Sequence, residues 1–216
     1  MLPFKNLLFD LDGTLIDSSD GIIRSAQYAF EKLGKEVPPY KTMFKFVGPP
    51  LDDTFRNDYG FTPEESIQAV LFYRERYHID GVKEAAPYEG IDELLTDLRQ
   101  AGYDLYVATS KPEKLAQEFL AMHGLAHHFT EICGALEFSR KNKDEVIEYL
   151  LPKLQSGGEK SALMIGDRKF DVIGAAAFGI PCVGVKYGFA EEGEFEKAGA
   201  KYIVDTVNDL RELLLG

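Results

Sequence analysis

The sequence is poor in cysteine, has no tryptophan and lacks long apolar runs. Its 216 residues include two cysteines, Cys133 and Cys182, whose separation matches no zinc-binding spacing. We expect both to be reduced side chains of a core. No apolar run approaches the ~18 residues that a membrane span needs. The first apolar stretch, which ends at Asp10, is too short for a signal peptide, so we expect a cytoplasmic protein.

Positive charge is also scarce. Lysine and arginine total 24 against 36 aspartates and glutamates, so the formal net charge is −12. This balance disfavours nucleic-acid polymers and anionic membranes as partners. A small phosphorylated metabolite stays compatible with it, because a bound metal ion can invert the local field. The phosphate-binding loop pattern G-x-x-x-x-G-K-[ST] and the dinucleotide pattern G-x-G-x-x-G are both absent.

Short apolar runs alternate with helical patterns, which predicts an α/β fold with an open, doubly wound, mostly parallel, Rossmann-like sheet. The expected strands are Asn6–Phe9, Asp104–Ala108, Glu131–Cys133, Ala162–Ile165, Cys182–Val185 and Tyr202–Val204. The expected helices are Ile91–Ala101, Pro112–His123, Lys143–Leu154, Asp171–Phe178, Glu192–Ala198 and Val207–Leu215.

Residues 17–86 break this alternation and contain no convincing strand. We expect them to form an inserted α-helical subdomain, with residues 1–16 and 87–216 forming the α/β core. Two apolar stripes at helical spacing support this interpretation. They are Ile22, Ala26, Ala29, Phe30 and Leu33, and Ile67, Val70 and Leu71 with Arg74.

The strongest chemical signal is FDLDGTLIDS at residues 9–18, in which Asp10 and Asp12 directly follow an apolar strand. In extended chain these carboxylates point to the same side, ~6.6 Å apart by strand rise. Two like charges that close repel each other unless a cation is present. The pair can hold Mg²⁺, or it can divide nucleophilic attack and proton transfer between its members. The alternative is a solvated Asp-Gly turn.

Three weaker motifs also follow strands or begin helices. GDRKFD at residues 166–171 carries Asp167 and Asp171, although Asp171 alone could be a capping residue. Thr109 and Ser110 end a strand before a helix, where hydroxyls bind phosphate or cap the helix. The third, SRKNKD at residues 139–144, places three cations at the start of a helix. Either an anion binds in front of them, or they belong to a solvated basic loop.

In their order and spacing these motifs resemble the haloacid dehalogenase-like hydrolase superfamily, in its phosphoglycolate phosphatase-like branch with a helical cap. The resemblance covers essentially the whole chain. It implies a Mg²⁺-dependent phosphatase that hydrolyses a small phosphomonoester through an aspartyl-phosphate. Phosphoglycolate, a sugar phosphate, a nucleotide or pyrophosphate are the expected substrates. We expect a monomer or a homodimer.

The resemblance also assigns roles to individual residues. Asp10 would be the nucleophile, and Asp12 would be the general acid and then the base. Thr109 would bind the phosphoryl group, and Lys143 would neutralise charge on the phosphate, with Lys141 as a competitor for that role. The Mg²⁺ ligands would be carboxylate oxygens of Asp10 and Asp167 and the backbone carbonyl of Asp12, while Asp171 would orient the site. Ser110 and Arg74 are further candidates for binding substrate; Arg74 could instead form a salt bridge between cap and core.

Two other functions remain open from the sequence. A phosphomutase of the same superfamily, similar to β-phosphoglucomutase, would return the phosphoryl group to a sugar. A phospho-aspartate receiver also places acids, a hydroxyl and a lysine on a doubly wound sheet. Receivers are about half this length and lack a cap, which disfavours that alternative.

Overall fold

The chain divides into two compact units in the computed structural model, which describes residues 2–136, 139–155 and 157–216. The core unit comprises Met1–Ile16 and Pro87–Gly216, and the inserted unit comprises Asp17–Ala86. Two short strands, β2 (Ile16–Asp17) and β3 (Ala86–Pro87), pair where the chain passes between the units.

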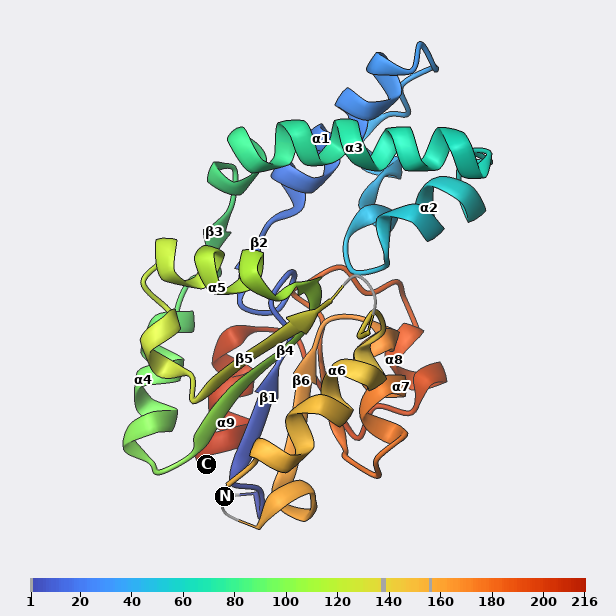
Figure 1. Cartoon of the computed structure of the whole chain (residues 1–216). Helices are drawn as coiled ribbons and strands as arrows, with labels where there is room; N and C mark the ends of the chain where they lie inside the picture. Colours follow the sequence, from blue (N-terminus) through green and yellow to red (C-terminus); the bar gives the residue numbers. More distant parts are fainter. Residues whose placement is uncertain (1, 137–138, 156) are drawn as a thin grey trace. The chain divides into compact units, whose positions relative to one another are not determined.

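The core unit is built on a six-stranded sheet in the order β5-β4-β1-β6-β7-β8 (Figure 1). All its neighbouring strands pair in parallel. The central strand β1 has β4 on one side and β6 on the other, so the chain order reverses there. In open α/β sheets ligands bind beyond the carboxyl ends of the strands at such a reversal. The strands are β1 (Asn6–Phe9), β4 (Asp104–Pro112), β5 (Glu131–Ala135), β6 (Ala162–Gly166), β7 (Cys182–Val185) and β8 (Tyr202–Val204).

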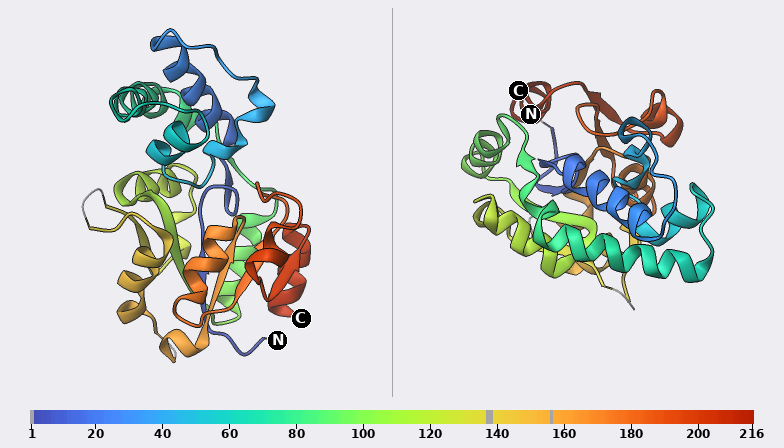
Figure 2. Two further views of the ribbon diagram at one scale, coloured as in Figure 1. Left: turned by 90° about the vertical axis from the view of Figure 1, so that its right-hand side faces the viewer. Right: turned by 90° about the horizontal axis from the view of Figure 1, so that it is seen from above.

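Helices cover both faces of the sheet, which confirms the predicted doubly wound α/β class. Helices α4 and α9 pack together on one face, and α6 and α7 pack together on the other (Figure 2). Both cysteines are buried and unbonded, as expected. The helices are α4 (Ile91–Gln100), α5 (Glu113–Met122), α6 (Lys143–Leu150), α7 (Lys169–Ala176), α8 (Glu194–Ala198) and α9 (Val207–Leu215).

Most of the other observed bounds differ from the expected ones by one or two residues, and those of β4 and α6 differ by four. Strand β4 continues past Ala108 to Pro112, because its pairing with β5 resumes at Pro112 after an irregularity in register. Helix α6 ends at Leu150 rather than Leu154, and Leu151–Lys153 forms a 3-10 turn. Pro152 explains this end, since proline lacks the amide that would continue the helix and clashes with the preceding turn.

The inserted unit contains three α-helices among its described residues: α1 (Ser19–Lys32), α2 (Leu51–Asn57) and α3 (Pro63–Ile79). Helices α1 and α3 pack side by side (Figures 1 and 2). Four residues of the first predicted stripe are buried on α1, namely Ile22, Ala26, Ala29 and Phe30, whereas Leu33 lies just past the end of the helix and is half-buried.

The stripe predicted on α3 is wrong. Ile67 and Leu71 are 59% and 52% exposed, Arg74 is also exposed, and Val70 is half-buried. The buried face instead carries two small residues and two tyrosines, Ser66, Ala69, Tyr73 and Tyr77. The two tyrosine rings stack with centroids 5.3 Å apart. Burying the large tyrosine rings removes much apolar surface from water, so this face of α3 is buried in place of the aliphatic face.

None of the helices in the described ranges combines the length and the apolar character needed to cross a membrane.

Candidate active site

The loop after β1 is a tight, buried turn that carries Asp10 and Asp12. The carbonyl of Leu11 accepts hydrogen bonds from the amides of Leu15 and Ile16 at 3.0 and 3.1 Å. Gly13 has φ of +81°, and a Cβ there would lie 2.1 Å from Asp167 Oδ2. Only glycine fits this position, since the left-handed backbone and the approaching carboxylate both exclude a side chain. The close approach of Asp167 argues against a solvated Asp-Gly turn.

Asp10 lies beside a lysine from another element. Lys143, the first residue of α6, places its Nζ 2.9 Å from Asp10 Oδ1 and 2.8 Å from Asp171 Oδ1. It also donates to the carbonyl of Ala108 at 2.8 Å. Lys143 is buried, whereas Lys141 is exposed. The geometry therefore places Lys143, and not Lys141, beside Asp10.

Asp167 and Asp171 follow β6, the other neighbour of β1. Asp167 Oδ2 accepts a hydrogen bond from the Phe189 amide at 2.9 Å. Its Oδ1 is buried and accepts no hydrogen bond from the described part of the chain. Asp171 Oδ2 accepts from the Arg168 amide at 3.0 Å, just before α7 begins. Asp171 is thus a capping residue, which was one of the two roles considered for it from the sequence. It also forms an ion pair with Lys143.

Thr109 and Ser110 lie near the carboxyl end of β4, the neighbour of β1 on the other side. Thr109 is buried and its Oγ1 accepts a hydrogen bond from the Lys111 amide at 3.2 Å. Ser110 is half-buried. These residues lie in the segment where the register with β5 is irregular, and Thr109 and Lys111 are both buried there.

Lys111, to which no sequence motif assigns a role, is buried in the site. Its Nζ lies 2.9 and 3.1 Å from the two carboxylate oxygens of Asp12. The signal that could have found it is its position two residues beyond Thr109, at the carboxyl end of β4.

Glu194 is a second buried residue to which no sequence motif assigns a role. Its carboxylate accepts hydrogen bonds from Arg168 Nε at 3.0 Å and from the amides of Lys169 and Glu191 at 2.7 and 3.1 Å. Glu194 thereby ties the start of α8 to the loop that carries Asp167. No local pattern joins positions 168 and 194, so only the fold brings them together.

Six ionisable residues form a group that we call the acidic cluster, in which acids outnumber bases: Asp10, Asp12, Asp167, Asp171, Lys111 and Lys143. Burial raises the pKa of Asp10 to about 7, although Lys143 opposes the rise, and Asp171 adds to it. Burial, followed by the neighbouring charges of Asp171 and Asp10, raises the pKa of Asp167 well above its usual range. Burial opposes the charge of Lys143, but Asp10 and Asp171 outweigh it and raise the pKa of that ammonium. Lys143 is therefore a cation at neutral pH.

A divalent cation fits this cluster. Asp10, Asp167 and Asp171 each offer a carboxylate oxygen within 4.8 Å of the others. With Asp12, Lys143 and Lys111, four carboxylates face two ammonium groups when all are ionised, an excess of two negative charges. Among the residues that the structure describes, no donor reaches the buried Oδ1 of Asp167. Hard oxygen ligands of this kind suit Mg²⁺.

Arg74 is exposed on α3 of the inserted unit. Its assignment to a substrate anion therefore stays a prediction.

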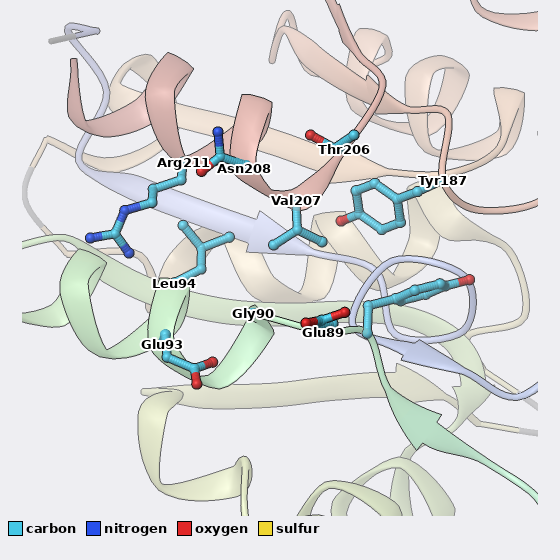
Figure 3. Close-up of a pocket in the computed structure, with 10 residues that line it drawn as sticks. Glu89, Gly90, Glu93, Leu94, Tyr187, Thr206, Val207, Asn208 and Arg211 are labelled. Atoms are coloured by element: carbon cyan, nitrogen blue, oxygen red, sulfur yellow. The ribbon is translucent and has the colours of Figure 1, made fainter.

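A pocket of about 610 Å³ lies between α4 and α9, and none of the residues that line it belongs to the acidic cluster. Figure 3 shows Leu94, Val207 and Tyr187 around this space. The hydroxyl of Tyr187 donates to the carbonyl of Thr14 at 3.0 Å. One wall of the pocket thereby supports the loop that carries Asp10 and Asp12.

Comparison with known proteins identifies relatives over nearly the whole chain. The sequence is 41% identical over 214 residues to a 5'-nucleotidase of Pseudomonas aeruginosa, covering 99% of this chain and 96% of that protein. It is 39% identical over 212 residues to tyrosine-protein kinase PtkA of Mycobacterium tuberculosis, covering 96% of this chain and 72% of that one. It is 30% identical over 224 residues to a phosphoglycolate phosphatase of Vibrio cholerae, covering 100% and 99%.

Solved structures agree with these relatives. The crystal structure of a predicted phosphatase from Clostridium acetobutylicum superposes with a TM-score of 0.92 at 40% identity, over 98% of each chain. The profile of haloacid dehalogenase-like hydrolases matches residues 7–185, which include the four motifs. The expected enzyme class, a hydrolase of phosphoric monoesters, agrees with two of the three relatives by name. The chain belongs to the haloacid dehalogenase-like hydrolase family.

Proposed function

We propose that the protein is a Mg²⁺-dependent phosphatase that hydrolyses a small phosphomonoester through an aspartyl-phosphate on Asp10. One observation carries the proposal. At the carboxyl end of β1, buried Asp10 lies 2.9 Å from the ammonium of Lys143 and within 4.8 Å of two further carboxylates. This arrangement supplies a nucleophile, a fixed cation and an excess of negative charge that a divalent ion would balance.

Asp10 attacks the phosphorus in this proposal, and Lys143 acts on the charge of the transferring group. The equatorial oxygens of a phosphate repel an anionic nucleophile, so positive charge beside Asp10 lowers that barrier. Thr109 on the neighbouring strand donates a hydrogen bond to the phosphoryl oxygens, and Ser110 is a second candidate donor. Splitting the reaction at an aspartyl-phosphate replaces one hard step by two easier ones.

Asp12 transfers protons in both half-reactions. In the first it gives a proton to the leaving oxygen. In the second the resulting carboxylate takes a proton from the water that attacks the phosphoryl group on Asp10. Asp12 is only partly buried, which leaves its carboxylate accessible to substrate and water.

The metal site in this proposal consists of carboxylate oxygens of Asp10 and Asp167 and the backbone carbonyl of Asp12. Asp171 orients it, because its two oxygens already face Lys143 and the Arg168 amide. When bound, Mg²⁺ would supply positive charge to the phosphoryl oxygens.

The substrate in this proposal is a small phosphorylated metabolite. A nucleoside monophosphate and phosphoglycolate are supported by the names of two relatives. A sugar phosphate and pyrophosphate belong to the same size class. The inserted unit would act as a cap that selects among them, and Arg74 is its candidate contact to a substrate anion.

Turnover of p-nitrophenyl phosphate tests the proposal. We expect phosphate release with Mg²⁺ and none in EDTA. Asp10→Asn removes the nucleophile and should lower the rate by several orders of magnitude, while the circular dichroism spectrum stays that of the wild type. Asp205→Asn is the matched control, because Asp205 is 73% exposed and outside the acidic cluster; it should keep full activity. Equal turnover by Asp10→Asn and the wild type would contradict the proposal.

A further inference from the structure

Each acid of the Asp10-Leu11-Asp12 segment has a buried lysine of its own. Lys143 accompanies Asp10, and Lys111 accompanies Asp12. The side chain of Lys111 is 6% exposed and that of Asp12 is 13% exposed. Lys111 Nζ contacts both carboxylate oxygens of Asp12, at 2.9 and 3.1 Å. A contact to both oxygens restrains rotation of the carboxylate plane as well as its position.

The backbone of β4 and β5 holds Lys111 in this place. The register between the two strands shifts between Ala108 and Pro112, which changes the course of the chain at Lys111. A Cβ at Gly134 of β5 would lie 2.5 Å from the Lys111 carbonyl, so a glycine is needed for this approach. The Lys111 ammonium also lies 4.6 Å from the centroid of the Phe119 ring. The lysine is thus confined by backbone, by an aromatic face and by Asp12.

Stability alone is a poor explanation for this ion pair. Burying an ammonium and a carboxylate costs desolvation energy that their attraction often fails to exceed, and apolar side chains of similar size serve a core equally well. Moreover, the pair includes Asp12, the residue proposed to exchange protons with both the leaving oxygen and the attacking water. Orientation of that residue is a function that an apolar pair could not perform.

We propose that Lys111 is a positioning residue that holds the Asp12 carboxyl group in the orientation required for proton transfer. This inference rests on the proposed function. In the first half-reaction an Asp10 oxygen forms a bond to phosphorus, and the bond from phosphorus to the leaving oxygen breaks. Its electron pair stays on the leaving oxygen, which takes the proton of Asp12 and departs as an alcohol.

The inference predicts a dependence on the leaving group. p-Nitrophenolate is stable as an anion, so its departure needs little help from a proton. 4-Methylphenolate is far more basic and departs readily only when a proton reaches its oxygen. General acid catalysis contributes about 10²–10⁴-fold where it is needed. Loss of Lys111 should therefore slow the 4-methylphenyl ester much more than the nitrophenyl ester.

The experiment compares kcat/KM for these two esters, which have nearly the same shape. We expect Lys111→Met to lose at least ~10-fold more activity on 4-methylphenyl phosphate than on p-nitrophenyl phosphate. Asp12→Asn should show the same selective loss. Lys111→Arg, which keeps the charge, should recover part of it. Lys114→Met is the matched control, since the Lys114 side chain is 90% exposed; it should behave as the wild type.

A structural role for Lys111 would give a different result. An equal loss on both esters, or no loss, would overturn the inference while leaving the phosphatase in place. If the wild type hydrolyses neither ester, the proposed function and this inference both fail. Thermal melting shows whether Lys111→Met is folded at the assay temperature. If it is not, Lys111→Gln undergoes the same comparison and is judged by the same outcomes.

Discussion

At the scale of single residues, the buried charges of the core unit are grouped rather than scattered. The ammonium of Lys143, for example, lies within 2.9 Å of two carboxylates and a backbone carbonyl. Removing one member of such a group leaves the others buried without compensation, which costs more than the group itself contributes. The residues proposed for chemistry are therefore also residues on which the local fold depends.

Lys143→Met tests this coupling. The variant keeps an unbranched side chain that is one heavy atom shorter, but it leaves Asp10 and Asp171 without their shared cation. We expect the free energy of unfolding to fall by about 3–5 kcal/mol and phosphatase turnover to be lost. Urea denaturation and turnover of p-nitrophenyl phosphate measure the two effects.

Lys141→Met provides the comparison, because Lys141 is two residues away and exposed. It should change the free energy of unfolding by less than about 0.5 kcal/mol and leave turnover unchanged. If Lys141→Met lost activity and Lys143→Met did not, the exposed lysine would be the one that acts on the phosphate.

At the scale of helices and strands, the sequence predicts what is locally encoded. All six strands of the sheet were predicted, and β1, β7 and β8 have the expected bounds, because a continuous apolar run marks a strand buried on both faces. The acids at the ends of β1 and β6 were predicted for the same reason, since parallel strands bring their carboxyl ends to one edge.

Contacts between distant elements were not predictable in this way. The pairing of Lys111 with Asp12 spans 99 residues and depends on the register of β4 against β1. The buried face of α3 depends on its packing against α1. That face carries small residues and tyrosines, while most of the aliphatic stripe is exposed. Periodicity shows that a helix has an apolar side, but the neighbouring element decides which side is buried.

Glu194 offers a test of one such contact, between α8 and the loop after β6. Burial would raise the pKa of Glu194, but hydrogen bonds from Arg168 and two backbone amides outweigh it and lower the pKa below the ordinary value. A carboxylate with a lowered pKa stabilises the fold above its unfolded pKa of about 4.3, and this stabilisation is lost as the pH falls through the lower, folded value.

We therefore expect Glu194→Gln to lower the free energy of unfolding by about 1–3 kcal/mol at pH 7, with the difference shrinking below about pH 4. Urea denaturation of wild type and variant across this range measures it. Glu192→Gln is the control, because Glu192 is exposed and should show no such difference. A loss for Glu194→Gln that stayed constant down to pH 3 would mean that the carboxylate's charge is not what stabilises the contact.

At the scale of the whole molecule, the net charge of −12 and the acidic cluster both favour the binding of cations. A bound cation lowers the self-repulsion of an acidic protein, and the acidic cluster holds two excess negative charges in a buried place when all its groups are ionised. The core unit contains the entire cluster, because Asp10, Asp12, Lys111, Lys143, Asp167 and Asp171 all lie in residues 1–16 and 87–216. Divalent ions should therefore stabilise the core unit specifically.

Mg²⁺ should raise the melting temperature of the core unit, because an ion that binds only the folded state stabilises it by mass action. At a concentration 100 times Kd the gain is about 2.7 kcal/mol, which at this size corresponds to roughly 5–10 °C. Differential scanning calorimetry with Mg²⁺ and with EDTA measures it. Asp167→Asn replaces the carboxylate whose buried Oδ1 has no donor within the described ranges, and it should abolish the rise, whereas Asp205→Asn should keep it. An equal rise in Asp167→Asn and the wild type would place the ion elsewhere and separate the stability of the core unit from this cluster.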